Sequence, residues 1–183
     1  LGNPDRRTSI DKLNPFTIKG VAPAALDMFM FESLCSFSMD EPQAMYGLLA
    51  EAMLVAPDLS SISFRLNPLA RFNNGDPVTA EDVADSFKRL KGKLVSPTYS
   101  TPLAGVDRAV VVDASTVRFD LKERTVDTLF ALGYMRVFSR KWRRQALVRR
   151  GGRQAHHDRA LHDHRTANAQ PHRAAAQPAV LGA

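Results

Sequence analysis

The run from Phe64 to Leu90 constrains the fold of this chain most, because each part of it indicates a defined local structure. Phe64 and Leu66 stand two residues apart, which is typical of a half-buried strand. The sequence Asn-Asn-Gly-Asp-Pro at residues 73–77 then predicts a tight turn in which Gly75 takes a positive φ. A strand and a turn are therefore expected before the next segment begins.

A capped helix is predicted to follow the turn. The Thr79 hydroxyl can accept the backbone N–H of Asp82, and Glu81 and Asp82 lie favourably in the first helical turn. Apolar residues then recur at helical spacing, and charged residues are expected to face water between them. The apolar set is Val83, Phe87 and Leu90, and the charged set is Asp85, Lys88, Arg89 and Lys91.

Three runs resemble the bacterial extracellular solute-binding proteins of family 5, which deliver peptides, and sometimes nickel or haem, to ABC importers. The longest is Arg71-Phe72-Asn73-Asn74-Gly75-Asp76-Pro77-Val78-Thr79-Ala80-Glu81-Asp82-Val83. The other two are Leu13-Asn14-Pro15-Phe16 and Tyr46-Gly47-Leu48-Leu49-Ala50-Glu51. The resemblance extends from residue 4 to about residue 142, so the chain is interpreted as an N-terminal fragment of such a receptor.

The resemblance implies an α/β fold: a partial lobe of a type II periplasmic-binding-protein fold, with a mixed sheet and flanking helices, over residues 1–142. It also implies a monomeric, non-enzymatic peptide receptor in the periplasm, partnered by a membrane permease, with no cofactor and no nucleic-acid partner. The first residues lack the apolar core of a secretory signal, so a leader and a first strand are expected upstream. Because one lobe cannot close on a ligand, we expect this chain to bind peptide weakly or not at all.

Asn14 and Phe16 are the candidate ligand-binding residues, since the resemblance places their loop beside the cleft. The alternative is that Phe16 packs in the core and Asn14 holds a turn before Pro15. Both interpretations remain open from the sequence.

Further elements are predicted from hydrophobic spacing. Residues 24–34 and 128–137 carry apolar residues typical of helices. Strands are expected at Ser61–Leu66, Val106–Val112 and Thr116–Leu121.

Enzymatic chemistry is not indicated before residue 143. The lone cysteine, Cys35, lies among apolar residues, and no histidine precedes His156 to serve as its base. Glu81, Asp82 and Asp85 could suggest a cation site, but the electrostatics of a helix N-terminus explain the first two without one.

The tail differs sharply from the rest of the chain. Residues 139–183 hold ten Arg and Lys and two Asp, which leaves 15 basic and 17 acidic residues before them. Residues 143–183 contain no Phe, Tyr, Trp, Ile or Met, so we predict that they are disordered. In the alternative, this is a small basic protein whose tail binds nucleic acid, or a metal through His156-His157-Asp158 and His162-Asp163-His164. No aromatic residues are interleaved for base stacking, and the histidine spacing fits no established ligand pattern.

We hypothesise that the tail is read out of frame, with the change between about residues 129 and 151. Reverse translation of residues 156–167 with GC-rich codons, shifted by one nucleotide, can yield a sequence near Ile-Thr-Thr-Ala-Pro-Ser-Met-Thr-Thr-Gly-Pro. This resembles the Pro-x-x-Thr-Gly-Pro-Tyr element that follows in the family, except for the aromatic residue. Sequencing the locus is expected to reveal an intact frame one nucleotide away, and its absence would refute the hypothesis.

Overall fold

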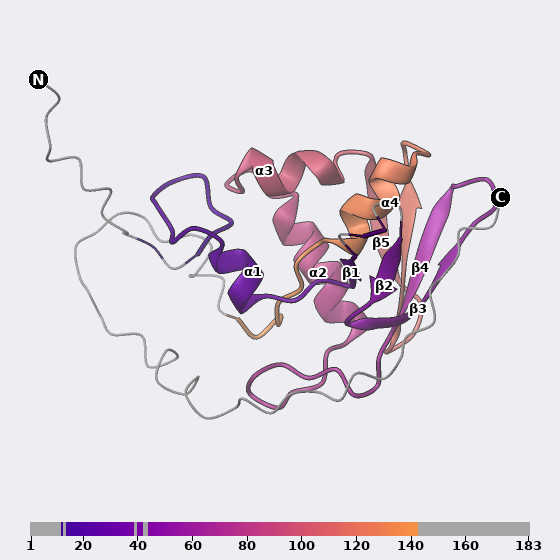
Figure 1. Ribbon diagram of the computed structural model, residues 1–183, viewed down its shortest axis with the longest axis horizontal. Coiled ribbons are helices and arrows are strands. Elements are labelled where there is room, and N and C mark those ends of the chain that lie inside the picture. The colour runs from indigo at the N-terminus through magenta and orange to yellow at the C-terminus, as the bar shows by residue number, and fades with distance from the viewer. Residues whose placement is uncertain (1–11, 13, 39, 42–43, 143–183) are drawn as a thin grey trace, which may run out of the picture.

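The computed structural model describes residues 12, 14–38, 40–41 and 44–142, and these centre on a four-stranded sheet (Figure 1). The strand order is β3-β4-β6-β5, and each neighbouring pair is antiparallel. The strands are β3 (Ala50–Val55), β4 (Ser61–Leu66), β5 (Val106–Val111) and β6 (Thr116–Leu121).

The two central strands carry the core on one face. Their side chains alternate between buried and more exposed positions, as a strand covered on one side requires. The buried set is Ile62, Phe64 and Leu66 from β4, with Val117, Phe119 and Leu121 from β6. Residues of the two sets lie opposite each other across the ladder, for example Phe64 opposite Val117.

Helix α2 (Ala80–Leu90) packs against β5 and β6 on the covered face. The ring of Phe87 meets that of Phe119 edge to face, with the ring centroids 5.4 Å apart. Phe119 meets Phe64 in a similar geometry at 6.0 Å. The apolar helical spacing read from the sequence therefore defines the face that α2 buries.

The predicted turn and cap are confirmed. Gly75 has a φ of 85°. Thr79 Oγ1 accepts the Asp82 N–H at 3.3 Å, and the Asp82 carboxylate accepts the Thr79 N–H at 3.1 Å. The two bonds form a reciprocal capping box that begins α2.

Most of the remaining elements contribute buried or partly buried side chains to the same core. A two-stranded antiparallel sheet of β1 (Cys35–Phe37) and β2 (Met45–Gly47) packs beside α4 (Val126–Gly133), and Gly133 allows this close approach. A Cβ at Gly133 would lie 2.6 Å from Met45 Sδ, so a larger residue would force the Met45 side chain to shift. Between β4 and β5 lie also α3 (Pro97–Ser100) and the 3₁₀ helix η1 (Thr101–Leu103).

Two predicted helices are shorter than their apolar spacing suggested. Helix α1 spans Leu26–Met30 alone, because Phe31 adopts an extended conformation and its ring packs into an aromatic cluster. Helix α4 ends at Gly133. The following segment is extended, and the Val137 N–H donates to the Glu32 carbonyl at 2.9 Å. Tertiary contacts overrode the helical pattern at both places.

The α/β class is confirmed, whereas the expectation of a mixed sheet is wrong for the described residues, whose strand pairs are all antiparallel. The strands of the β3–β4 and β5–β6 hairpins run antiparallel, as hairpin strands must. The central pair, β4 and β6, is antiparallel as well, so no parallel pair is formed. The predictions made for residues 143–183 lie outside the described residues. Within the described part of the chain, no helix is long and apolar enough to cross a membrane.

Candidate functional site

The candidate site is a shallow hollow of about 400 Å³ beside the loop at residues 15–25. The loop is anchored to the segment that follows α2. The Ile18 N–H donates to the Leu94 carbonyl at 3.0 Å, and the Ser96 N–H donates to the Phe16 carbonyl at 2.7 Å. The hollow is lined by Lys12, Pro15, Thr17, Ile18, Gly20 to Ala25, Asp27, Ser96 and Tyr99.

The two candidate residues taken from the sequence lie at the start of this loop, and both are buried. Asn14 is buried, and its Oδ1 accepts the Phe16 N–H at 2.9 Å. The Phe16 side chain has no exposed surface, and its ring lies 5.0 Å from that of Phe31 and 4.9 Å from that of Tyr99. This placement fits the packing alternative, and a ligand-binding role for the pair stays a prediction.

The polar groups that face the hollow come from elsewhere in the chain. Asp27 on α1 forms an ion pair with Arg136, whose Nε lies 3.7 Å from Asp27 Oδ2. Burial, with the nearby Asp27 carboxylate, raises the pKa of Tyr99. Lys12 Nζ donates to the Thr17 carbonyl at 2.5 Å. The sequence did not select Asp27 or Tyr99 as residues of the site, because residues 27, 99 and 136 meet only in the folded chain.

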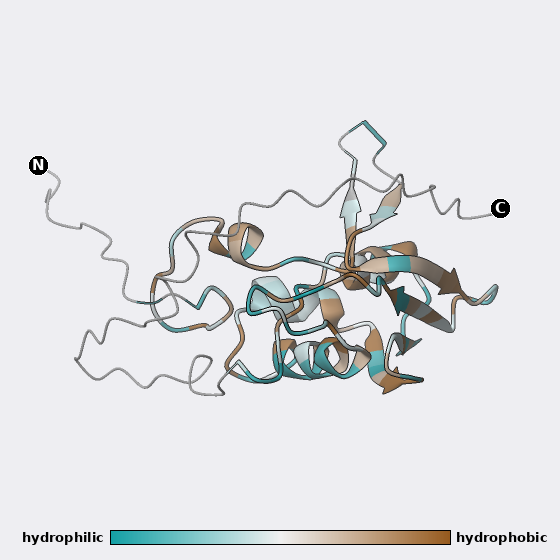
Figure 2. Cartoon of the chain, turned by 90° about the horizontal axis from the view of Figure 1, so that it is seen from below, coloured by the Kyte–Doolittle hydropathy of each residue, from teal (hydrophilic) through white to brown (hydrophobic). Residues whose placement is uncertain are grey.

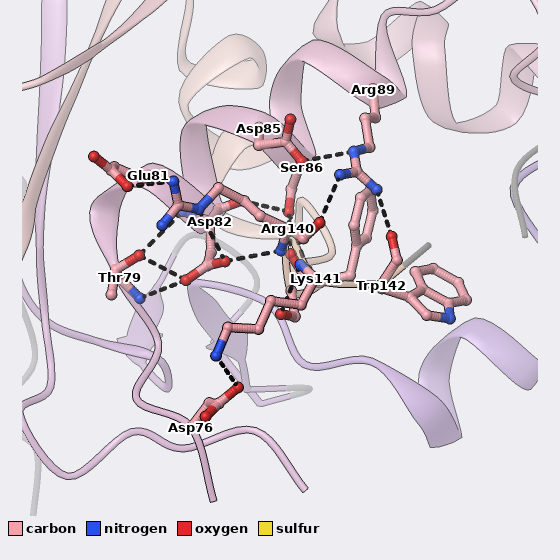
Figure 3. Close-up of polar contacts among 12 residues, drawn as sticks. Asp76, Thr79, Glu81, Asp82, Asp85, Ser86, Arg89, Arg140, Lys141 and Trp142 are labelled. Atoms are coloured by element: carbon pink, nitrogen blue, oxygen red, sulfur yellow. Dashed lines mark hydrogen bonds and ion pairs between the residues drawn. The ribbon is translucent and has the colours of Figure 1, made fainter. Parts of the chain in front are cut away.

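A second polar region connects α2 to residues 138–142 (Figure 3). The buried Asp82 carboxylate accepts the Arg140 N–H at 2.9 Å, and Ser86 Oγ accepts the Phe138 N–H at 3.0 Å. Arg89 donates to the carbonyls of Arg140 at 3.2 Å and Trp142 at 3.1 Å. The polar face of α2 thus holds this segment, which includes a turn closed by the Trp142 N–H on the Ser139 carbonyl at 3.0 Å.

The carboxylates considered as a cation site are paired with basic side chains. Arg140 forms ion pairs with Glu81 and Asp82, while Arg89 Nε lies 2.6 Å from Asp85 Oδ2. Within the described residues, no group of three or more His, Cys, Asp or Glu could hold a metal ion.

The prediction that Arg89 faces water is wrong. Its side chain retains 14% of its accessible surface, and its guanidinium lies 5.7 Å from the centroid of the Phe138 ring. The pattern on α2 could not reveal this contact, because Phe138 lies about fifty residues further along the chain.

Cys35 is a buried free thiol, in keeping with its apolar neighbours in the sequence. Burial raises its pKa to about 11, which leaves very little reactive thiolate at neutral pH. The described part of the chain contains no histidine.

Comparison with known proteins identifies the family. The sequence model of the bacterial extracellular solute-binding proteins, family 5 (middle region), matches residues 44–160, well over half of the chain. The chain belongs to solute-binding protein family 5. This family consists of non-enzymatic, extracellular binding components of ABC importers.

Relatives of this family 5 chain include two Agrobacterium fabrum proteins. The peptidoglycan-binding protein YepA is 37% identical over 123 residues, covering 63% of this chain and 20% of YepA. The probable peptide-binding protein YejA is 34% identical over 116 residues, covering 63% of this chain and 18% of YejA. The family 5 chain thus spans about a fifth of the length of these relatives.

A solved structure supports the fold of this family 5 chain. NikA from Brucella suis, in complex with Fe(III)-EDTA, matches 72% of this chain with a TM-score of 0.59, 20% sequence identity and coverage of 26% of NikA. The described residues therefore form part of a periplasmic-binding-protein fold.

Proposed function

We propose that this chain contributes one wall of a peptide-binding site in the receptor of an ABC importer. Family membership supports the receptor function. The hollow beside residues 15–25 supplies the candidate wall. As a receptor of this family, it would pass its ligand to a membrane permease.

A peptide ligand suits the chemistry of the hollow. Residues 20–25 are exposed or half-buried, and the carbonyls of Val21, Pro23 and Ala25 already accept backbone N–H groups of this chain. An extended peptide would meet the remaining main-chain groups of the stretch directly or through water.

Lys12 places a cation at the hollow, and Asp27 places there a carboxylate that also pairs with Arg136, so charges of both signs are near the positions of peptide termini. The names of the Agrobacterium relatives favour peptide or peptidoglycan ligands over a free metal ion.

Asn14 and Phe16 are proposed to act on the ligand through the loop. Asn14 holds the Phe16 N–H, and the Phe16 ring anchors the loop to the core. The pair would then set the position of the backbone that a peptide meets.

The isolated chain is expected to bind peptide with a Kd in the millimolar range, or without detectable heat, because a single wall leaves most of the ligand in water. Isothermal titration with trialanine and with a peptidoglycan stem peptide measures this. If weak binding is detected, Asp27→Asn should remove it. The control is Arg108→Ala on the exposed face of β5, which should not change the binding. Micromolar affinity in the wild-type chain would contradict the expectation of weak binding by a single wall.

A further inference from the structure

The turn before α2 contains a reactive pair of residues that the proposed function does not use. Asn74 is followed directly by Gly75, and both residues are exposed. Figure 1 shows the loop between β4 and α2 at the lower edge of the molecule, and Figure 2, which views the chain from below, shows hydrophilic colour along it. Water therefore has access to the Asn74 side chain.

The sequence makes Asn74 the asparagine best suited to attack by its own backbone. The backbone nitrogen of the residue after an asparagine can bond to the side-chain amide carbon and close a five-membered ring. Proline has no N–H to supply, which excludes the three asparagines that precede proline, Asn3, Asn14 and Asn67. Asn73 precedes Asn74 and Asn168 precedes Ala169, whose side chains crowd the attacking nitrogen, whereas Gly75 has no Cβ.

The geometry of the turn favours reaction at the Asn74 side-chain carbonyl. The Asp76 N–H donates to Asn74 Oδ1 at 3.1 Å, where it would stabilise the negative charge that develops on this oxygen during attack. Asn74 Nδ2 donates to Asp76 Oδ2 at 2.9 Å. A Cβ at Gly75 would meet no atom within 4 Å. The amide is therefore polarised and held in place beside a glycine with open space around it.

A hydrogen bond restrains the attacking nitrogen. The Gly75 N–H donates to the Phe72 carbonyl at 2.8 Å, and the Phe72 N–H donates to the Asp76 carbonyl at 2.8 Å. Attack requires the Gly75 nitrogen to leave this bond and to lose its proton. The reaction therefore proceeds when the exposed turn opens locally, which costs less free energy than unfolding the chain.

We propose that Asn74 is a site of spontaneous deamidation, with water as the co-reactant. The Gly75 nitrogen forms a bond to Asn74 Cγ, the Cγ–Nδ2 bond breaks, and ammonia leaves with the proton that the nitrogen gives up. Water then opens the cyclic imide at either carbonyl, which yields aspartate or isoaspartate at position 74. The reaction needs no oxidant or reductant. The proposal does not depend on the ligand of the receptor.

Deamidation would weaken the turn. Asp76 Oδ2 also pairs with Lys141 Nζ at 2.8 Å (Figure 3). The hydrogen bonds from Lys141 and Asn74 hold the pKa of Asp76 below its ordinary value, so this carboxylate is charged at neutral pH. The reaction removes the Nδ2 donor and places a second carboxylate beside Asp76. The isoaspartate product also adds a backbone carbon, so the two hydrogen bonds of Phe72 can no longer close the turn as they do now.

Peptide mass spectrometry tests the site. The full chain is incubated at mildly alkaline pH in water labelled with heavy oxygen and is then digested. We expect a mass gain of about 3 Da at Asn74, because the amide becomes a carboxylate with one labelled oxygen. Asn73 is the matched control in the same exposed turn, and its labelling should be at least about ten-fold slower, because the next residue carries a side chain. Absence of label at Asn74, or equal labelling at both positions, would overturn the proposal.

Two further measurements test the mechanism. In concentrated urea, where folding of the variant is not required, Gly75→Ala should label at Asn74 at least about five-fold more slowly than the wild-type chain. The wild-type chain should itself react faster in urea than in buffer, since the Phe72 carbonyl no longer holds the Gly75 N–H. Equal rates for the two chains in urea would refute attack by the Gly75 nitrogen. A slower reaction of the wild-type chain in urea would refute the requirement that the turn opens.

Discussion

Replacing Phe16 with alanine is expected to lower the free energy of unfolding by about 3–5 kcal/mol, the usual cost of removing a buried aromatic side chain. Phe16 is fully buried, and its ring contacts those of Phe31, Tyr99 and Phe138 at centroid distances of 5.0, 4.9 and 5.7 Å. The change leaves a cavity where three separate segments of the chain meet. Urea unfolding followed by circular dichroism measures the loss.

Two controls separate packing from ligand binding at Phe16. Phe16→Leu retains most of the apolar volume and should cost about 1–2 kcal/mol. Val111→Ala, at a position that is 41% exposed on β5, should change the stability by no more than about 0.5 kcal/mol. If Phe16→Ala left the stability unchanged, the ring would not be a core residue and its direct role toward a ligand would regain support.

Replacing Asp82 with alanine is expected to cost about 2–4 kcal/mol, because it removes half of the capping box and leaves the Arg140 N–H without its acceptor. Asp82 is 5% exposed, so water cannot easily replace the carboxylate. The segment at residues 138–142 should then loosen from α2 before the sheet unfolds.

Trp142 reports on this loosening, since it is the single tryptophan of the chain and its carbonyl accepts from Arg89. In Asp82→Ala we expect acrylamide to quench its fluorescence more strongly in the native state. The control is Glu81→Ala, whose exposed side chain also pairs with Arg140 but should contribute no more than about 0.5 kcal/mol. Equal effects of the two substitutions would argue against Asp82 as the anchor of the segment.

The accuracy of the sequence predictions depended on how far apart the interacting residues lie along the chain. The turn at Gly75, the Thr79 cap and the strand Ser61–Leu66 were predicted and are confirmed, because each depends on residues within a few positions of one another. The packing of Cys35 was also predictable, since apolar neighbours and the absence of a nearby base leave it no catalytic role.

The candidate site was predicted less completely. Sequence resemblance selected the loop that contains Asn14 and Phe16, and that loop borders the hollow. It did not select Asp27 or Tyr99, because their approach requires α1 to pack beside the segment after α2.

The sequence by itself determined the turn, the helix cap, the strands and the family, since caps, turns and alternating strands are specified by short-range hydrogen bonds and side-chain periodicity. Only the tertiary structure decided which polar side chains leave the solvent. Arg89 has a charged side chain on a helix whose pattern predicts exposure, yet residues 138–142 cover it. It likewise decided that the apolar residues of α1 face outward, because burial depends on which distant segments are present to cover a surface.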